Sequence, residues 1–223
     1  MTTKAVILDL DGTLLDTALD IAAAANAMLA ELGRPACSVN DIRRYIGRGI
    51  PNLIKRCLAG RLEAADDSAP PPATALAIFQ SHYAVSNGRH ATMYPGVIEG
   101  LRAMQDQGLR LACVTNKATA FTLPLLAASG LASWFELVVC GDTLARNKPD
   151  PLPLLHICHR FGLQPAEVLV IGDSLNDVKA ARAAGCPIFC VPYGYNEGED
   201  VRKLDCDAIV ATLAEASTRI PIA

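Results

Sequence analysis

The chain alternates short runs of consecutive apolar residues with longer segments in which apolar residues recur at helical spacing. The short runs are apolar at nearly every position, which is typical of parallel strands covered on both faces. Strands are expected at residues 5–10, 110–115, 137–140, 167–171, 187–191 and 208–210, and helices at 96–107, 118–129, 151–161 and 176–184. This repeated strand–helix–strand order predicts the α/β class with a doubly wound parallel sheet.

One connection is far longer than the others. About a hundred residues separate the first two expected strands, whereas a crossover between parallel strands needs much less. The stretch has helical patterns at residues 16–32, 38–46, 51–58 and 73–86, and a polar, proline-rich connector at 66–72. The sequence therefore predicts an α/β core domain of residues 1–15 and 86–223, with a helical cap domain of residues 16–85 inserted after the first strand.

Composition narrows the classes of function. The chain has 223 residues, 51% of them hydrophobic, and a formal net charge of -3. With no strongly basic face, binding to nucleic acid or to a membrane surface is not expected. No apolar run reaches the length of a spanning helix, and the first residues do not resemble a signal peptide. The eight cysteines form no CxxC pair, so we expect free thiols in the cytoplasm.

Groups that handle phosphate or metal follow several of the expected strands. In an open parallel sheet, ligands bind outside the carboxyl ends of the strands, so these groups are expected to converge on one edge. They are Asp9 and Asp11 after the first strand, Thr115 and Asn116 after the second, Lys148 beyond the third, and Asp173 and Asp177 after the fourth.

The residue types at this edge fit phosphoryl chemistry. Clustered carboxylates need a cation among them, and an oxygen site made by Asp9, Asp11 and Asp173 suits Mg²⁺. A carboxylate can attack phosphorus, and a second acid can protonate the leaving alcohol. Thr115 and Lys148 can bind phosphate oxygens. Asp177 is expected to hold Lys148 in position or to support the metal site.

The motifs DLDGT, Thr115, NKPDP and GDSLND together resemble the four motifs of the haloacid dehalogenase superfamily, in the same order along residues 5 to about 195. The resemblance implies a Rossmann-like core, with Asp9 as nucleophile and Asp11 as acid and base. It further implies that Asp9, the backbone carbonyl of Asp11, and Asp173 hold Mg²⁺, and that Thr115, Asn116 and Lys148 bind the phosphoryl group. Dehalogenases lack an acid at the position of Asp11, so phosphoester hydrolysis is favoured.

Two softer resemblances concern the substrate. The cap stretch RYIGRGI and the later stretch GYNEGE are similar to segments of phosphoglycolate phosphatases. They imply hydrolysis of a small phosphorylated metabolite, 2-phosphoglycolate, to glycolate and phosphate, with Arg48 meeting the substrate carboxylate. Arg48 can equally be a solvated cap residue.

Several alternatives stay open at this point. A phosphatase for another small metabolite and a transferase similar to β-phosphoglucomutase use the same motifs. A receiver-like signalling domain is the alternative that is not an enzyme. The sequence does not distinguish a monomer from a homodimer.

Overall fold

A computed structural model describes residues 2–63 and 70–222 of the chain. Its main sheet has six parallel strands in the order β5-β4-β1-β6-β7-β8. The strands are β1 (Ala5–Leu8), β4 (Arg110–Val114), β5 (Leu137–Val139), β6 (Val168–Gly172), β7 (Ile188–Cys190) and β8 (Ala208–Ile209). All six strands expected from the sequence are present, so the prediction of an α/β fold with a parallel sheet is confirmed.

Helices cover both faces of this sheet, which explains the continuous apolar runs. On β1, Val6 and Leu8 belong to one buried cluster, whereas Ala5 and Ile7 belong to the other. Successive side chains of a strand point to opposite faces, so all four must be apolar. One face is covered by α5 (Val97–Asp106), α6 (Thr119–Ala128) and α9 (Leu213–Arg219), and the other by α7 (Leu152–Phe161) and α8 (Leu175–Ala184).

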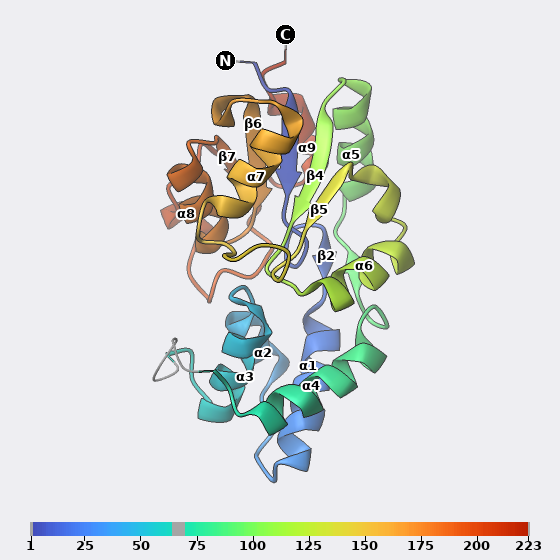
Figure 1. The fold of residues 1–223 in the computed structure, drawn as a ribbon, viewed down its shortest axis with the longest axis vertical. Coiled ribbons are helices and arrows are strands. Elements are labelled where there is room, and N and C mark those ends of the chain that lie inside the picture. The colour runs from blue at the N-terminus through green and yellow to red at the C-terminus, as the bar shows by residue number, and fades with distance from the viewer. Residues whose placement is uncertain (1, 64–69, 223) are drawn as a thin grey trace.

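The remaining helices lie together at the end of the molecule opposite the chain termini (Figure 1). They are α1 (Ala18–Glu31), α2 (Val39–Tyr45), α3 (Gly49–Ala59) and α4 (Ala73–Ser86). Met28, Ile54 and Phe79 are fully buried in a third apolar cluster that these helices share. Part of the expected connector at 66–72 lies outside the described residues. Three short 3₁₀ helices complete the fold: η1 (Ala132–Trp134), η2 (Pro165–Glu167) and η3 (Val201–Lys203).

A two-stranded antiparallel ribbon joins the core to these four helices. It pairs β2 (Leu15–Asp16) with β3 (Thr92–Met93), with Leu15 opposite Met93. The buried Asp20 carboxylate of α1 accepts the amides of Gly88, His90 and Ala91 at 2.8, 2.8 and 3.1 Å, which fixes the returning segment. The chain therefore leaves and re-enters the core at adjacent points. The cap boundaries at 16 and 85 stay a prediction.

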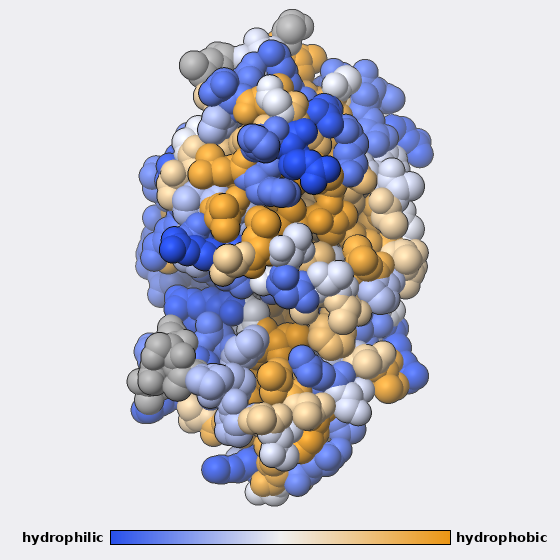
Figure 2. Space-filling model, in the orientation of Figure 1, coloured by the Kyte–Doolittle hydropathy of each residue, from blue (hydrophilic) through white to orange (hydrophobic). Residues whose placement is uncertain are grey.

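The surface is hollowed where the core meets the four helices, and apolar residues border the hollow (Figure 2). No described helix has the length and apolar character needed to cross a bilayer. All eight cysteines are free thiols.

Candidate active site

The turn after β1 brings its two acids to the sheet edge. The amide of Asp9 still bonds to the carbonyl of Ile171 on the neighbouring strand at 3.0 Å, and the chain then turns sharply at Gly12, whose φ is 89°. A Cβ at Gly12 would lie 2.3 Å from Oδ2 of Asp173. Both the left-handed backbone and the lack of space require glycine in this motif.

Three of the predicted acids meet at this edge. One carboxylate oxygen from each of Asp9, Asp173 and Asp177 lies within 4.8 Å of the others. The Lys148 ammonium is 2.8 Å from Asp9 and 2.7 Å from Asp177, and it also donates to the carbonyl of Val114 at 2.8 Å. All three hydrogen-bond donors of Lys148 therefore have fixed acceptors.

Charge in this group is unbalanced. The group has three carboxylates and one ammonium, which pairs with Asp9 and Asp177 but not with Asp173, so its net charge is -2 when all are ionised. Burial raises the pKa of Asp9 to about 7; Lys148 has the next largest effect and opposes this rise, whereas Asp177 and Asp11 add to it. Burial and the neighbouring Asp9 raise the pKa of Asp173 well above its usual value. A divalent cation would balance these charges, and the hard oxygen donors suit Mg²⁺.

The Asp173 carboxylate is held by hydrogen bonds and by close contacts with neighbouring residues. Its carboxylate accepts the Thr13 hydroxyl at 2.8 Å and the Tyr195 amide at 2.5 Å. A Cβ at Gly194 would lie 2.3 Å from Oδ2 of Asp173. The Tyr195 hydroxyl in turn accepts the amides of Thr17 and Ala18 at 2.8 and 3.1 Å, at the start of α1. The GYNEGE stretch thus connects a predicted metal ligand to the start of the cap.

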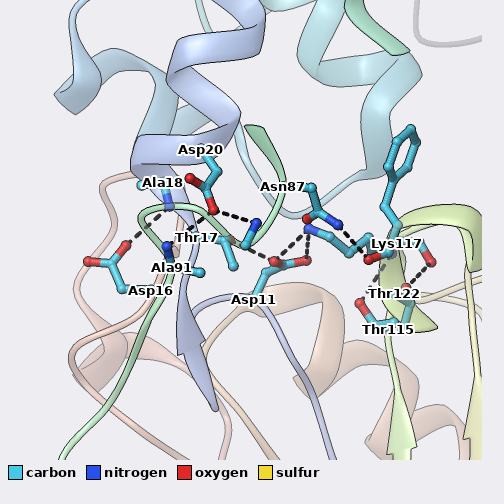
Figure 3. A network of polar contacts seen from close by, with 12 residues as sticks. Asp11, Asp16, Thr17, Ala18, Asp20, Asn87, Ala91, Thr115, Lys117 and Thr122 are labelled. Atoms are coloured by element: carbon cyan, nitrogen blue, oxygen red, sulfur yellow. Dashed lines mark hydrogen bonds and ion pairs between the residues drawn. The ribbon is translucent and has the colours of Figure 1, made fainter. Parts of the chain in front are cut away.

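Asp11 lies in a separate ion pair. Its carboxylate accepts the Thr17 hydroxyl at 2.6 Å and the Lys117 ammonium at 2.8 and 3.1 Å (Figure 3). Burial is the largest single effect on the pKa of Lys117 and lowers it, but the combined effects of Asp11 and Tyr83 outweigh burial and raise this pKa. Lys117 is a site residue that the sequence motifs did not identify, although it directly follows Thr115 and Asn116.

Thr115 and Asn116 shape the floor of the site. The Thr115 hydroxyl accepts the amide of Lys117 at 3.1 Å. The Asn116 side chain donates to the carbonyl of Lys148 at 2.8 Å and to that of Gly47, in the cap, at 3.0 Å. Asn116 therefore joins the loop that carries Lys148 to the RYIGRGI stretch of the cap.

A cavity lies between the core and the cap. Its core wall carries the predicted acids Asp9 and Asp11 and both lysines. Its cap wall is largely apolar, formed by Ile21, Ile46, Ile50, Leu53, Phe79 and Tyr83 together with Gly47 and Gly49. The charged side chains that line the cavity therefore come from the core, and the apolar side chains that line it come largely from the cap.

Arg48 is not among the residues that line this cavity. Its Nε is 2.8 Å from Oε1 of Glu197 and its terminal NH₂ donates to the other carboxylate oxygen at 3.1 Å. Glu197 also pairs with the buried Arg56 at 2.6 Å. The structure thus places Arg48 in a contact between cap and core, where Glu197 of the GYNEGE stretch is its partner.

Comparison with known proteins gives consistent matches along the whole chain. The profile of the family described as haloacid dehalogenase-like hydrolase matches residues 6–191. Proteins named phosphoglycolate phosphatase from Thiobacillus denitrificans and Nitrosospira multiformis are each 56% identical over 217 residues, which is 97% of this chain and 95% of each relative. A crystal structure of a predicted phosphoglycolate phosphatase from Haemophilus somnus superposes with a TM-score of 0.88 at 32% identity and covers 98% of both chains.

Proposed function

We propose, from the premise that this chain belongs to the haloacid dehalogenase-like hydrolase family and is a phosphoric monoester hydrolase, that its substrate is 2-phosphoglycolate. We further propose that the reaction uses Mg²⁺ and passes through an aspartyl-phosphate intermediate. The observation that carries the proposal is the group of three buried carboxylates with Lys148 at the sheet edge, directly below a small cavity. The assignment as a phosphoric monoester hydrolase follows from the family and the named relatives. The substrate, the metal and the residue roles are proposed.

In the proposed reaction, a carboxylate oxygen of Asp9 attacks phosphorus while the bond from phosphorus to the ester oxygen breaks. Asp11 gives a proton to the departing glycolate oxygen and then removes one from the water that attacks the same phosphorus. That second attack releases inorganic phosphate and restores the Asp9 carboxylate. Asp11 is suited to this work because it lines the cavity beside Asp9 but lies outside the three-carboxylate group.

The other residues bind and orient the phosphoryl group. Lys148 is held by three acceptors, so its charge is already positioned for phosphate oxygens that approach Asp9. Thr115 and Asn116 also line the cavity, beside Lys148. Asp177 positions Lys148 through the 2.7 Å ion pair.

We propose that Asp9, Asp173 and the backbone carbonyl of Asp11 hold Mg²⁺, with Asp177 supporting the site. The fit rests on the two unbalanced negative charges and on the oxygen donors described above. When bound, the ion would offset the negative charge shared by the phosphate and the carboxylates.

The cap wall supports a small substrate. A bisphosphorylated hexose, as a mutase requires, carries several hydroxyl groups that need polar partners when buried. The cap side chains that line the cavity are aliphatic or aromatic, and Tyr83 is the one among the described residues with a polar group. 2-Phosphoglycolate has no free hydroxyl group, because its one alcohol oxygen is esterified to phosphate. A receiver-like domain is not favoured, since the four cap helices and the family match both indicate a hydrolase.

The test of the mechanism is Asp9→Asn. The amide cannot form the acyl phosphate, and we expect phosphate release to fall by at least about 10⁴-fold. The control is Asp106→Asn, an exposed acid at the end of α5, which should keep full activity. Turnover by Asp9→Asn at near the original rate would refute the assignment of the nucleophile.

The test of the substrate is a phosphate-release screen over small phosphate monoesters, with Mg²⁺ and with EDTA. We expect 2-phosphoglycolate to have the highest kcat/KM and EDTA to abolish turnover. Equal turnover of many unrelated esters would overturn the substrate proposal and leave the phosphatase intact.

A further inference from the structure

The cavity contains two ammonium groups whose surroundings differ. Among the described residues that line it, Lys117 and Lys148 are the cations. Lys148 is shared between two carboxylates and a backbone carbonyl. Lys117 has one carboxylate partner, Asp11, and faces the Tyr83 ring with its ammonium 5.0 Å from the ring centroid.

The backbone of Lys117 is rigidly held, so its side chain is aimed at the cavity by the fold. The amide of Lys117 donates to the Thr115 hydroxyl at 3.1 Å, and its carbonyl accepts the Gly141 amide at 2.8 Å and the Thr122 hydroxyl at 3.2 Å. The side chain is 4% exposed. A buried ammonium attracts anions strongly, because little water competes for it.

The position of Asp11 sets where a substrate carboxylate must lie. In the proposed reaction Asp11 contacts the ester oxygen, and in 2-phosphoglycolate the carboxyl carbon is two bonds from that oxygen. Because Lys117 is 2.8 Å from Asp11, a carboxylate attached through one methylene group comes within reach of the Lys117 ammonium. On the other side of the cavity the cap wall offers apolar side chains.

We propose that Lys117 binds the carboxylate of the substrate and thereby selects 2-phosphoglycolate over uncharged esters of the same size. This inference rests on the proposed function and gives Lys117 the role that the resemblance to phosphoglycolate phosphatases implied for Arg48. Arg48 is held by Glu197 at 2.8 Å outside the cavity lining. Lys117 is therefore a specificity-determining residue, whereas Arg48 attaches the cap to the core.

The experiment compares two substrates that differ in charge and hardly in shape, 2-phosphoglycolate and its amide, 2-phosphoglycolamide. It uses the full-length enzyme with saturating Mg²⁺ and three variants: Lys117→Met, Lys117→Arg and Arg48→Met. Circular dichroism and the melting temperature verify that each variant is folded. The readout is the ratio of kcat/KM for the carboxylate to kcat/KM for the amide, because this ratio cancels any effect on Asp11 that both substrates share.

For the wild type we expect a ratio of at least about 10, as hydrogen bonds to charged groups imply. Lys117→Met should bring the ratio to about 1, and Lys117→Arg should keep most of the preference because it retains the charge. Arg48→Met should leave the ratio unchanged. These results together would support the inference.

Three results would overturn it, and each points to a different conclusion. If the wild type prefers the carboxylate and Lys117→Met retains that preference, the inference fails while the proposed function stands. If Arg48→Met removes the preference instead, Arg48 is the residue that binds the carboxylate. If the wild type has no preference for the carboxylate, both the inference and the substrate proposal fail.

Discussion

The two walls of the cavity are built on opposite principles. The core wall concentrates charge, with Asp9, Asp11, Lys117 and Lys148 all buried or nearly so. The cap wall is made of side chains such as Ile50, Leu53 and Phe79 that carry no charge. Charged groups interact more strongly where water is excluded, so the apolar wall increases the effect of the charged one.

The polar contacts of the cap lie around the cavity. Arg48 and Arg56 pair with Glu197, and Arg43 pairs with Asp16 at 2.7 Å. The pairs with Glu197 connect the cap to the core, and the pair with Asp16 attaches α2 to β2. None of them places a cap charge among the cavity-lining residues. The difference between the walls teaches that the charged groups come from the sheet edge, whereas the cap covers them with apolar side chains. The cap is held in place by the ion pairs of Arg48 and Arg56 with Glu197, which we call its rim.

The largest effect on activity is expected when Lys148→Met removes a positive charge from the core wall. Asp9 and Asp177 would lose their ammonium partner, and phosphate would lose a positioned cation, so kcat should fall by about 10³-fold. Phosphate release under saturating Mg²⁺ and substrate measures this. The control is Lys179→Met, an exposed lysine on α8. A variant that retains most of its kcat would show that the core wall does not depend on Lys148.

Without the proposed metal ion, the carboxylates of the core wall should lower the free energy of unfolding, and this loss should grow as pH rises. The pKa of Asp9 is about 7 in the folded protein and near 3.8 in the unfolded chain. Between these values the folded protein holds a proton that the unfolded chain has released, so the free energy of unfolding falls as pH rises.

Added Mg²⁺ should offset this loss, since in the proposed metal site it would bind the folded state through ionised carboxylates. Urea unfolding at pH 5, 6 and 7, with Mg²⁺ and with EDTA, checks this. We expect Mg²⁺ to stabilise the protein more at pH 7 than at pH 5. An equal effect at every pH would contradict the idea that the acidic group binds the ion.

A smaller effect is expected when the rim of the cap is weakened with Glu197→Gln. The buried Arg56 would lose its charged partner, and we expect a loss of about 2 kcal/mol in the free energy of unfolding together with a higher KM. The control is Glu199→Gln, which is exposed in the same loop and pairs only with Lys203 among the described contacts, at 3.4 Å. If both variants behave alike, Glu197 does not hold the cap.

The smallest effect is expected on the cap wall with Tyr83→Phe. The ring that faces Lys117 is retained, and a phenyl face also attracts a cation, so the free energy of unfolding should change by less than about 1 kcal/mol. Thermal unfolding and kcat/KM measure this. A large loss of activity would mean that the hydroxyl group itself takes part in binding.

Much of the fold could be predicted from the sequence, because buried parallel strands and amphipathic helices leave strong patterns. The strand at Arg110–Val114 and the helix at Ala73–Ser86 begin where the sequence indicated. The ribbon of β2 and β3 was missed, since a strand of two residues has no measurable period. The helix α9 (Leu213–Arg219) was also missed, although α2 is equally short and was predicted; the start signal at Thr212, whose side chain accepts the amide of Glu215, was not used.

Prediction of the site was limited by the need to know which strands are neighbours. Asp9, Asp173, Asp177 and Lys148 could be grouped because acids and a lysine at the ends of parallel strands converge. The pairing of Lys117 with Asp11 depends on the order and register of β1 and β4, where Leu8 lies opposite Cys113. The pairing of Arg48 with Glu197 joins residues 149 positions apart, and no local pattern signals it.

The ribbon that joins Leu15 to Met93 has an evolutionary consequence. Insertions are best tolerated where the two ends of the inserted segment are close together, and this pairing holds them side by side. The helices between them can be shortened, enlarged or exchanged as a module while the sheet keeps its order. New substrates could therefore arise by recombination at this junction, with the phosphate chemistry inherited unchanged.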